Sequence, residues 1–154
     1  MSDPILIAAA LIENDRGEIL LVRKRGTKAF MQAGGKIESG ESRFEALARE
    51  LDEELGLEVE RSDAQFLGVF TCDAANEPNH LIEAHIFRVR CERRHIVVAA
   101  ELAKAIWVTA DEADNLDLAP LTRDHILPIV RARATAVEPD LAHRSYRGAR
   151  QRAA

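Results

Sequence analysis

Apolar residues along the chain gather into short runs separated by turn-forming residues, which is the pattern of β-strands. Two runs, at residues 5–12 and 19–25, flank the sequence Asn-Asp-Arg-Gly at residues 14–17. Asparagine, aspartate and glycine favour tight turns, so these runs predict an N-terminal β-hairpin. Residues 65–72 and 81–91 predict a second hairpin in the same way.

One segment follows the 3.6-residue period of an α-helix instead. Its apolar stripe is formed by Phe44, Leu47, Ala48, Leu51 and Leu55. Ser42 stands three residues before Glu45, a capping-box spacing that opens a helix, and Gly56 is a suitable C-terminal cap. The sequence therefore predicts a helix over residues 42–55 with one face buried.

The remaining elements are shorter. A small strand is predicted at residues 33–37, another at 105–109, a helical turn at 111–115, and an amphipathic helix at 122–133 that Pro128 kinks or shortens. Strands and helices do not alternate along the chain as they do in a doubly wound parallel sheet. The pattern therefore indicates the α+β class.

Length and composition fit a single domain. The chain has 154 residues, of which 47% are hydrophobic, and this is enough for one core but not for two. We expect the domain to span residues 1–135. Residues 136–154 have little apolar content and carry several arginines, namely Arg144, Arg147, Arg150 and Arg152. We expect a flexible basic tail there.

Charge and cysteine content narrow the function classes. The net charge of −5 argues against a stable nucleic-acid partner, although a phosphate-handling site can still be locally basic. The N-terminus lacks the features of a signal peptide, and no apolar run is long enough to cross a bilayer, so we expect a cytoplasmic protein with no membrane partner. Cys72 and Cys91 have no metal-ligand spacing and are interpreted as buried reduced thiols. The sequence is compatible with a homodimer and does not decide the oligomeric state.

The polar face of the predicted helix carries Glu50, Glu53 and Glu54 at spacing i, i+3, i+4, so their side chains emerge together. Like charges at that spacing repel one another unless a cation holds them. Mg²⁺ binds a few carboxylates together with waters and phosphate oxygens, which makes this face a candidate magnesium site. The competing interpretation is a solvated face of paired charges, which is common on helices rich in glutamate and arginine.

These glutamates belong to a longer motif. Gly35, five residues, Glu41, seven residues, and then Arg-Glu-Leu-Asp-Glu-Glu-Leu-Gly-Leu at residues 49–57 fill every position of the Nudix box. On this motif the chain resembles the Nudix hydrolase family. It departs just upstream, where many relatives carry proline before the paired glycines and this chain has Ala33. The resemblance implies a mixed β-sheet between helices, an α/β/α sandwich.

The resemblance also implies a metal site. Glu50, Glu53, Glu54 and the main-chain carbonyl of Gly35 would bind Mg²⁺, for which Mn²⁺ is a substitute. Arg49 would orient these carboxylates through charge-assisted hydrogen bonds. The expected catalytic group therefore includes Glu50, Glu53 and Arg49.

Deprotonation of the attacking water requires a base, and the relatives differ in where it comes from. Glu50 is the first candidate. Glu101 is the alternative, because it lies six residues before Trp107, in the loop where other members supply an additional acidic group. Glu41 lies at the start of the helix and is expected to support the loop.

Positive charge near the motif comes from Arg23, Lys24, Arg25 and Lys36. These residues are candidates for contacting substrate phosphates, and plain surface charge is an equally compatible interpretation. Side chains alternate along a strand, so Arg23 and Arg25 share one face and Lys24 takes the other. Only one of the two sets is expected to reach a cleft.

The expected function is that of a Mg²⁺-dependent pyrophosphohydrolase. It would cleave a nucleoside diphosphate linked to another moiety by water attack at phosphorus. The leading substrate class is a nucleoside triphosphate, converted to monophosphate and pyrophosphate. The alternatives are hydrolysis of ADP-ribose or dinucleoside polyphosphates, a catalytically silent nucleotide-binding sensor, and an isomerase of prenyl diphosphates, which usually needs a catalytic cysteine.

Substrate identity is only weakly indicated, because it lies outside the motif. Aromatic residues make up 5% of the chain, so stacking against a base would depend on Phe30, Phe70 or Phe87. Thr122 lies where a polar side chain could contact the base.

Overall fold

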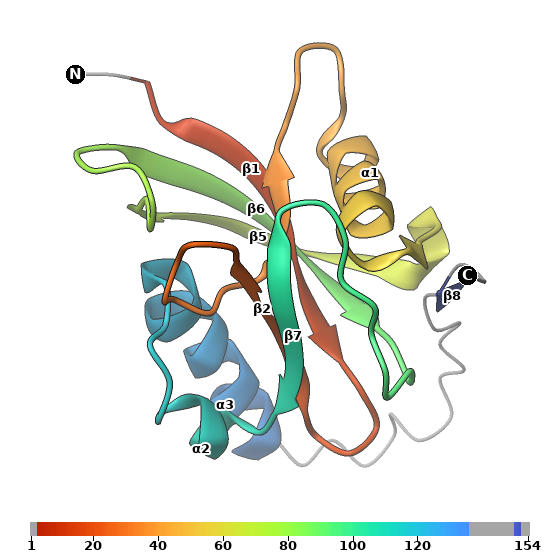
Figure 1. The fold of residues 1–154 in the computed structure, drawn as a ribbon. Coiled ribbons are helices and arrows are strands. Elements are labelled where there is room, and N and C mark those ends of the chain that lie inside the picture. The colour runs from red at the N-terminus through yellow and green to blue at the C-terminus, as the bar shows by residue number, and fades with distance from the viewer. Residues whose placement is uncertain (1–2, 136–149, 152–154) are drawn as a thin grey trace.

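The computed structural model describes residues 3–135 and 150–151, and its centre is a mixed β-sheet (Figure 1). The strands of this sheet are β1 (Ile5–Glu13), β2 (Ile19–Lys24), β3 (Ala33–Lys36), β5 (Ala64–Asp73), β6 (Leu81–Arg90) and β7 (Leu102–Val108). Their order is β5-β6-β1-β2-β7, with β3 also paired to β1. Both predicted hairpins are confirmed, and β7 begins earlier than the prediction of residues 105–109.

Strand β1 is the centre of the sheet because it has a partner along both edges. It pairs with β6 in parallel over its whole length, from Ile5 opposite Ile82 onward. On its other edge it pairs antiparallel first with β3 and then, at Glu13 opposite Ile19, with β2. Ala33, which replaces the proline of many relatives, is the β3 residue opposite Ala10.

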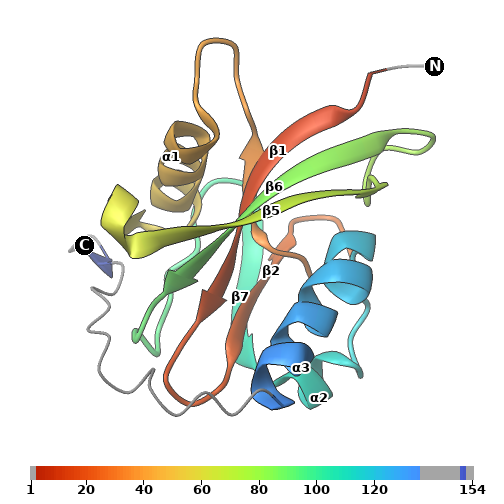
Figure 2. The ribbon, with the colours of Figure 1, turned by 180° about the vertical axis from the view of Figure 1, so that it is seen from behind.

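Helices cover both faces of the sheet, as Figures 1 and 2 show from opposite sides. Helix α1 (Arg43–Leu55) lies on one face. The other face is covered by α2 (Ala110–Ala113) and α3 (Leu127–Thr135), the latter preceded by the π-helical segment η2 (Thr122–Ile126). The predicted α+β class and the sandwich of helices around a mixed sheet are therefore confirmed.

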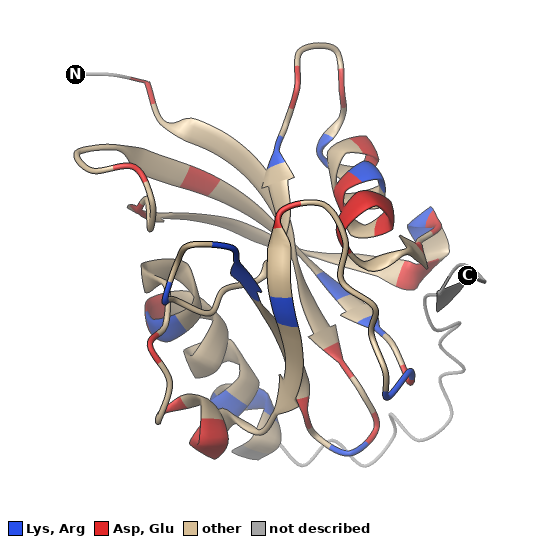
Figure 3. Cartoon of the chain, viewed as in Figure 1, with Lys and Arg blue, Asp and Glu red and all other residues tan. Residues whose placement is uncertain are grey.

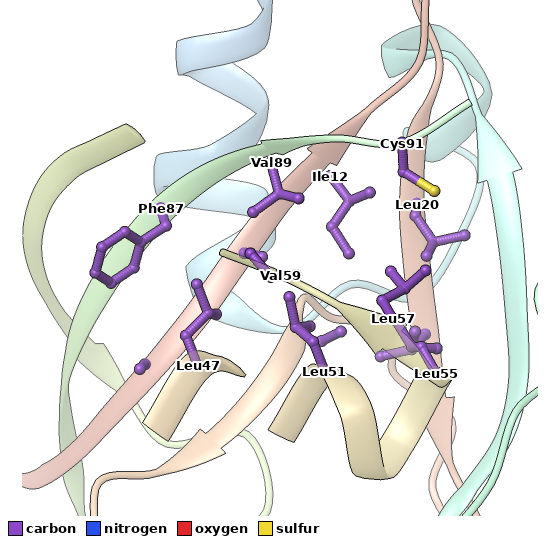
Figure 4. Packing of buried hydrophobic residues seen from close by; sticks show 14 of the residues in the cluster. Ile12, Leu20, Leu47, Leu51, Leu55, Leu57, Val59, Phe87, Val89 and Cys91 are labelled. Atoms are coloured by element: carbon purple, nitrogen blue, oxygen red, sulfur yellow. The ribbon is translucent and has the colours of Figure 1, made fainter. Parts of the chain in front are cut away.

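Each layer has its own hydrophobic core, because successive strand residues point to opposite faces. From β1, Ala8 and Ile12 enter the cluster beneath α1, whereas Ala9 and Leu11 enter the cluster beneath α3. Figure 4 shows the first cluster, in which the α1 residues Leu47, Leu51 and Leu55 meet strand residues and Cys91. Burial of this stripe fixes the rotation of α1 about its own axis, and therefore fixes where its glutamates lie.

The ends of α1 are those that the sequence predicts. The Ser42 hydroxyl accepts a hydrogen bond from the Glu45 N–H, and the Glu45 carboxylate accepts one from the Ser42 N–H. Gly56 ends the helix in the left-handed region at φ 63° and donates its N–H to Asp52 and Leu51. Glycine adopts this conformation without the steric cost that a side chain adds.

The last helix differs from the prediction in a specific way. Pro128 was predicted to kink or shorten it, but the helical segment continues to Thr135 and is widened before the proline, with a π-helical turn in which the Leu127 N–H donates to the Thr122 carbonyl. Proline lacks an N–H and its ring crowds the carbonyl four residues earlier, and a π turn accommodates that defect.

The C-terminal segment is described only in part. The two residues of β8 (Arg150–Gln151) pair with the short strand β4 (Leu57–Glu58), which follows α1. A 3₁₀ turn, η1 (Arg61–Asp63), follows β4 in the chain. The rest of the predicted basic tail at 136–154 lies outside the described residues. None of the helices described is both long and apolar enough to cross a membrane.

Candidate active site

Two glycines bring the backbone of β3 unusually close to its neighbours. A Cβ atom on Gly34 would lie 2.2 Å from the Ala8 carbonyl oxygen, and one on Gly35 would lie 2.4 Å from the Glu50 carboxylate carbon. Both distances are far inside van der Waals contact, so neither position tolerates a side chain without a shift of backbone or carboxylate. Gly35 therefore leaves the space that the Glu50 carboxylate occupies, whereas Gly34 allows β3 to approach β1 closely.

Glu54 fills part of this space and is almost completely buried, with 1% of its surface exposed. Its Oε1 accepts a hydrogen bond from the Gly34 N–H at 3.0 Å. The pKa of the Glu54 carboxyl is raised to about 8, chiefly by burial and also by the nearby charge of Glu50, whereas the hydrogen bond from Gly34 and the charge of Lys24 act in the opposite direction. A buried carboxylate with so little compensation is the kind of group that a cation stabilises.

Glu50 lies one helical turn before Glu54, and its side chain is 15% exposed. Burial raises the pKa of Glu50, the hydrogen bond from Arg49 lowers it, and the charges of Glu53 and Glu101 raise it again. The Arg49 Nη1 donates to Glu50 Oε1 at 2.8 Å. The carboxylate is therefore held in one orientation against Gly35.

Arg49 connects the helix to the loop before it. Its Nε and Nη2 atoms donate to the two oxygens of Glu41 at 2.7 and 2.9 Å, and Nη2 also donates to the Lys36 carbonyl at 3.1 Å. The Arg49 guanidinium holds the pKa of Glu41 at about 2, and a hydrogen bond from the Glu38 N–H contributes to this depression. This paired geometry supports the loop, which is the role expected for Glu41.

The remaining acidic candidates are more exposed. Glu53 is 55% exposed, and its Oε2 lies 3.6 Å from Arg49 Nη1. Glu101 is 63% exposed and lies 3.9 Å from the Lys24 ammonium group. Its main chain is fixed, because its carbonyl accepts the Arg25 N–H at 2.9 Å. Although Glu101 is far from α1 in the sequence, it lies near enough for its charge to raise the pKa of both Glu50 and Glu54.

In this conformation the acidic side chains do not yet enclose an ion: among residues 3–135 and 150–151, no three Asp, Glu, His or Cys side chains form a metal-binding group. The donors nevertheless fit a hard divalent cation. They are carboxylate oxygens, two of them are desolvated beside glycine backbone, and the exposed Glu53 and Glu101 can rotate toward them.

A cleft of about 500 Å³ opens beside Glu50 and Glu101, whereas Glu53 and Glu54 do not line it. Its acidic end is lined by Glu50, Gly34, Gly35 and Glu101, and its basic residues are Lys24 and Lys36. Figure 3 shows the acidic residues of α1 at this side of the sheet. We call the part of the cleft that is lined by Glu50, Gly34, Gly35 and Glu101 the acidic end. Its size and its mixed charge suit a nucleotide-sized ligand.

The basic candidates divide between the cleft and the surface, as the alternation along a strand predicts. Lys24 lines the cleft, whereas Arg23 and Arg25 do not. The Arg23 Nη1 donates instead to the Thr27 carbonyl at 2.8 Å. Lys36 lines the rim, where its ammonium group lies 3.3 Å from Glu77.

Much of the remaining lining is apolar. It comes from Ile5, Ile7, Ala9, Met31, Ile82, Ala119, Pro120 and Leu121, with Gln32 as a buried polar member, and Glu38, Asp73 and Glu77 line the same cleft. Ile7 and Ala9 lie opposite Lys36 and Gly34 in the β1–β3 pair, so this apolar lining adjoins the acidic end. We call it the aliphatic end. No aromatic side chain lines the cleft within the described part of the chain.

The four residues that were candidates for contacting a base do not line the cleft. Phe30 and Phe70 pack in or against the core cluster beneath α3, and Phe87 packs in the cluster beneath α1. Thr122 is fully buried and does not line the cleft, and its hydroxyl donates to Gln32 Oε1 at 3.0 Å. The composition of the chain does not reveal which phenylalanines face the core, so the sequence alone could not exclude them as residues that stack on a base.

Both cysteines are free, and neither lines the cleft. Cys91 is buried as predicted, whereas Cys72 is only partly buried. Burial is the main reason why the pKa of each thiol is raised. A raised pKa makes a thiol less nucleophilic near neutral pH.

Comparison with known proteins gives an independent view. The family model described as the NUDIX domain matches residues 4–129. A CTP pyrophosphohydrolase from Escherichia coli is 33% identical over 121 residues, which cover 75% of this chain and 84% of that protein. An 8-oxo-dGTP diphosphatase from Haemophilus influenzae is 40% identical over 57 residues, 34% of this chain and 42% of that protein.

The fold gives the same result. The solution structure of the E. coli ORF135 protein superposes with a TM-score of 0.64 at 30% sequence identity, over 90% of this chain and 95% of that chain. The glycines, the glutamates and the lysines that line the acidic end all fall within the matched residues 4–129.

Proposed function

Because this chain belongs to the NUDIX family, whose members generally use divalent cations, we propose that it is a Mg²⁺-dependent pyrophosphohydrolase acting on nucleoside triphosphates. Water attacks phosphorus, the anhydride bond breaks, and nucleoside monophosphate and pyrophosphate are released. The observation that carries the proposal is the pair of desolvated carboxylates, Glu50 and Glu54, held against Gly35 and Gly34. Glu50 and both glycines line a nucleotide-sized cleft, and Glu54 is buried directly behind Gly34.

Glu50 and Glu54, with the Gly35 carbonyl, would hold the cation, and Glu53 would join them after its exposed side chain turns from Arg49. Oxygen donors of this kind suit Mg²⁺, with Mn²⁺ as a substitute, far better than a metal that prefers sulfur or nitrogen. When bound, the ion supplies charge neutralisation for the phosphates and lowers the pKa of water.

The protein residues supply orientation and proton transfer. Arg49 fixes the Glu50 carboxylate, and Lys24 and Lys36 neutralise phosphate oxygens at the cleft wall. Glu50 is our first choice of base, because desolvation raises the pKa of its carboxyl and a more basic carboxylate accepts a proton more readily. Glu101 is the alternative base, since it lines the same cleft and its charge raises the pKa of Glu50.

Named relatives support the nucleotide substrate class, since one is called a CTP pyrophosphohydrolase and another an 8-oxo-dGTP diphosphatase. ADP-ribose and dinucleoside polyphosphates are the alternative substrates. The isomerase alternative is disfavoured because neither free thiol lines the cleft. A cytoplasmic location and a homodimer stay predictions.

A substrate panel with Mg²⁺ or Mn²⁺ tests the proposal. We expect hydrolysis of at least one nucleoside triphosphate, with pyrophosphate rather than phosphate as the product, and a strong loss of activity in Glu53→Gln. Full activity in that variant, or no hydrolysis of any compound with either ion, would defeat the proposal. Tight nucleotide binding without any product would favour the sensor alternative.

A further inference from the structure

Lys24 is a cleft residue that brings positive charge to the acidic end. It is the last residue of β2, and its side chain is 33% exposed. Its ammonium group lies 3.9 Å from the carboxylate of Glu101. Its charge also lowers the pKa of the buried Glu54, against the effects of burial and of the neighbouring Glu50. Lys24 therefore acts on the same carboxylates as the proposed cation.

Strand pairing fixes the main chains of Lys24 and Glu101. The register of β2 and β7 places Lys24 opposite Leu102, the residue that follows Glu101. The Glu101 carbonyl accepts the Arg25 N–H at 2.9 Å, and the Lys24 carbonyl accepts the Thr27 hydroxyl at 2.9 Å. The two side chains are therefore brought together by the sheet itself, and only their ends are free to turn.

The two cations that act on these carboxylates are held in different ways. Arg49 donates short hydrogen bonds to Glu41, at 2.7 and 2.9 Å, and to Glu50, at 2.8 Å. The contact of Lys24 with Glu101, at 3.9 Å, is longer than a hydrogen bond, and partly exposed ion pairs of this kind are weak. Lysine also carries its charge on a flexible stem. Lys24 is therefore the cation that can leave the acidic end, whereas Arg49 stays.

A divalent ion held by Glu50 and Glu54 would stand near the Lys24 ammonium group, and like charges at short range repel one another. We infer that Lys24 is an internal counter-ion of the acidic end, which competes with the divalent cation and which metal binding releases toward a phosphate of the substrate. This inference rests on the proposed function and adds a coupling between its two ligands, the cation and the phosphate chain.

The coupling follows from the two alternative partners of Lys24. A phosphate that draws Lys24 away from Glu101 leaves the carboxylates free to hold the cation more tightly. By linkage, the cation strengthens phosphate binding by the same factor. Lys24 therefore weakens metal binding in the protein alone and favours binding of the cation together with the phosphate chain.

The test measures Mn²⁺ binding to the protein without nucleotide, through the electron paramagnetic resonance signal of the unbound ion. Lys24→Met removes the charge and keeps a side chain of similar length, so we expect the Kd for Mn²⁺ to fall by about fivefold or more. Lys104→Met is the matched control, because Lys104 is exposed on β7 and does not line the cleft. At about 0.15 M ionic strength, where salt screens exposed charges, its Kd should stay within about twofold of wild type.

A gain of affinity is informative because a damaged fold would bind the ion more weakly. Lys24→Arg keeps the positive charge, and it should bind Mn²⁺ no more tightly than wild type does. Unchanged affinity in Lys24→Met, or the same gain in Lys104→Met, would overturn the inference.

A measurement on the wild-type side chain keeps the inference testable if a variant does not fold. The chain has four lysines, Lys24, Lys28, Lys36 and Lys104, so reductive methylation with ¹³C gives a simple NMR spectrum in which the lysines keep their charge. The Lys24 signal is assigned by its absence in Lys24→Arg. Addition of Mg²⁺ should shift this signal more than those of Lys28 and Lys104. A Lys24 signal that does not move at saturating Mg²⁺ would overturn the inference.

These results are distinguishable from a failure of the proposed function, because both measurements use only the protein and a metal ion. If the protein hydrolyses a nucleotide while Lys24→Met and wild type bind Mn²⁺ equally, the inference alone fails. If Lys24→Met gains affinity as expected and no nucleotide is hydrolysed, the proposed function fails and the competition between Lys24 and the cation stands.

Discussion

The two ends of the cleft treat buried polar groups in opposite ways. At the acidic end, Glu50 and Glu54 are desolvated, and their pKa values are raised because compensation is incomplete. At the aliphatic end, Gln32 is desolvated too, but it is neutral and is held by two hydrogen bonds within the protein. Desolvation costs a charge far more than it costs an amide.

This difference separates two tasks. The desolvated carboxylates of the acidic end favour a bound cation, and with it a reacting phosphate, because added positive charge offsets the cost of burying them. The neutral Gln32 amide carries no charge that a cation would offset, and its two hydrogen bonds stay within the protein. Substitutions at the acidic end should therefore lower kcat, whereas substitutions at the aliphatic end should raise KM.

Glu50→Gln is expected to have the largest effect. It removes a proposed metal ligand and base while keeping the shape of the side chain, so kcat should fall by about a thousandfold or more. Steady-state kinetics with Mg²⁺ measure this. Glu45→Gln is the matched control on the same helix, since the capping box accepts glutamine, and it should stay within about twofold of wild type. Comparable losses in both variants would mean that the helix, rather than the site, is affected.

Arg49→Lys should have the next largest effect. Lysine cannot reproduce the paired hydrogen bonds to Glu41 together with the bond to Glu50. We expect kcat to fall by about ten- to a hundredfold, as is typical when the groups that orient metal ligands are changed. Arg43→Lys on the same helix is the control. An Arg49→Lys protein with wild-type kcat would show that orientation of Glu50 does not matter.

The pH dependence of stability should reveal Glu54 directly. Its pKa is about 8 in the folded protein against an ordinary value of 4.5, so folding favours the protonated form. With a chelator present to remove metal ions, the contribution of Glu54 to the free energy of unfolding is fully present below about pH 4.5. It is lost as the pH rises toward 8, by at most about 1.4 kcal/mol per pH unit.

Urea unfolding of wild type and of Glu54→Gln at pH 5 and pH 8 measures this contribution. The stability of the variant relative to wild type should rise from pH 5 to pH 8, because glutamine carries no charge to bury. If the difference between the two proteins is the same at both values, Glu54 does not titrate in this range and its burial is overstated.

Ile82→Ala should have the smallest effect of the four. Removing aliphatic contact surface from the cleft wall should raise KM by about three- to tenfold and leave kcat unchanged. Leu81, the neighbouring residue, is 49% exposed and does not line the cleft, so Leu81→Ala is a control that should change neither constant. A fall in kcat for Ile82→Ala would remove the distinction between the two ends.

Much of the fold could be predicted because its signals are local. The capping box of Ser42 and Glu45, the glycine cap at Gly56 and the apolar stripe of α1 are all written within a few residues of one another. The same local motif identifies the acidic face and the family. Helical spacing does not, however, predict how deeply each side chain is buried. Glu54 is buried and Glu53 is exposed, although both were expected on one face.

The rest of the site depends on contacts between distant segments. The bond between Thr122 and Gln32 joins residues 90 positions apart, and a single sequence contains no periodicity that pairs them. The choice between Lys24 and its neighbours was predictable only as an alternation, since the strand must be placed before either face can be assigned to the cleft.

The central claim is that Glu50 and Glu54, beside Gly34 and Gly35, hold a divalent cation. Crystals soaked in Mn²⁺ test it through the anomalous signal of the ion. We predict a peak in direct contact with carboxylate oxygens of both residues, which is absent at the same position in Glu54→Gln. A peak elsewhere in the cleft with both carboxylates unliganded, or no peak at a concentration that supports hydrolysis, would contradict the account.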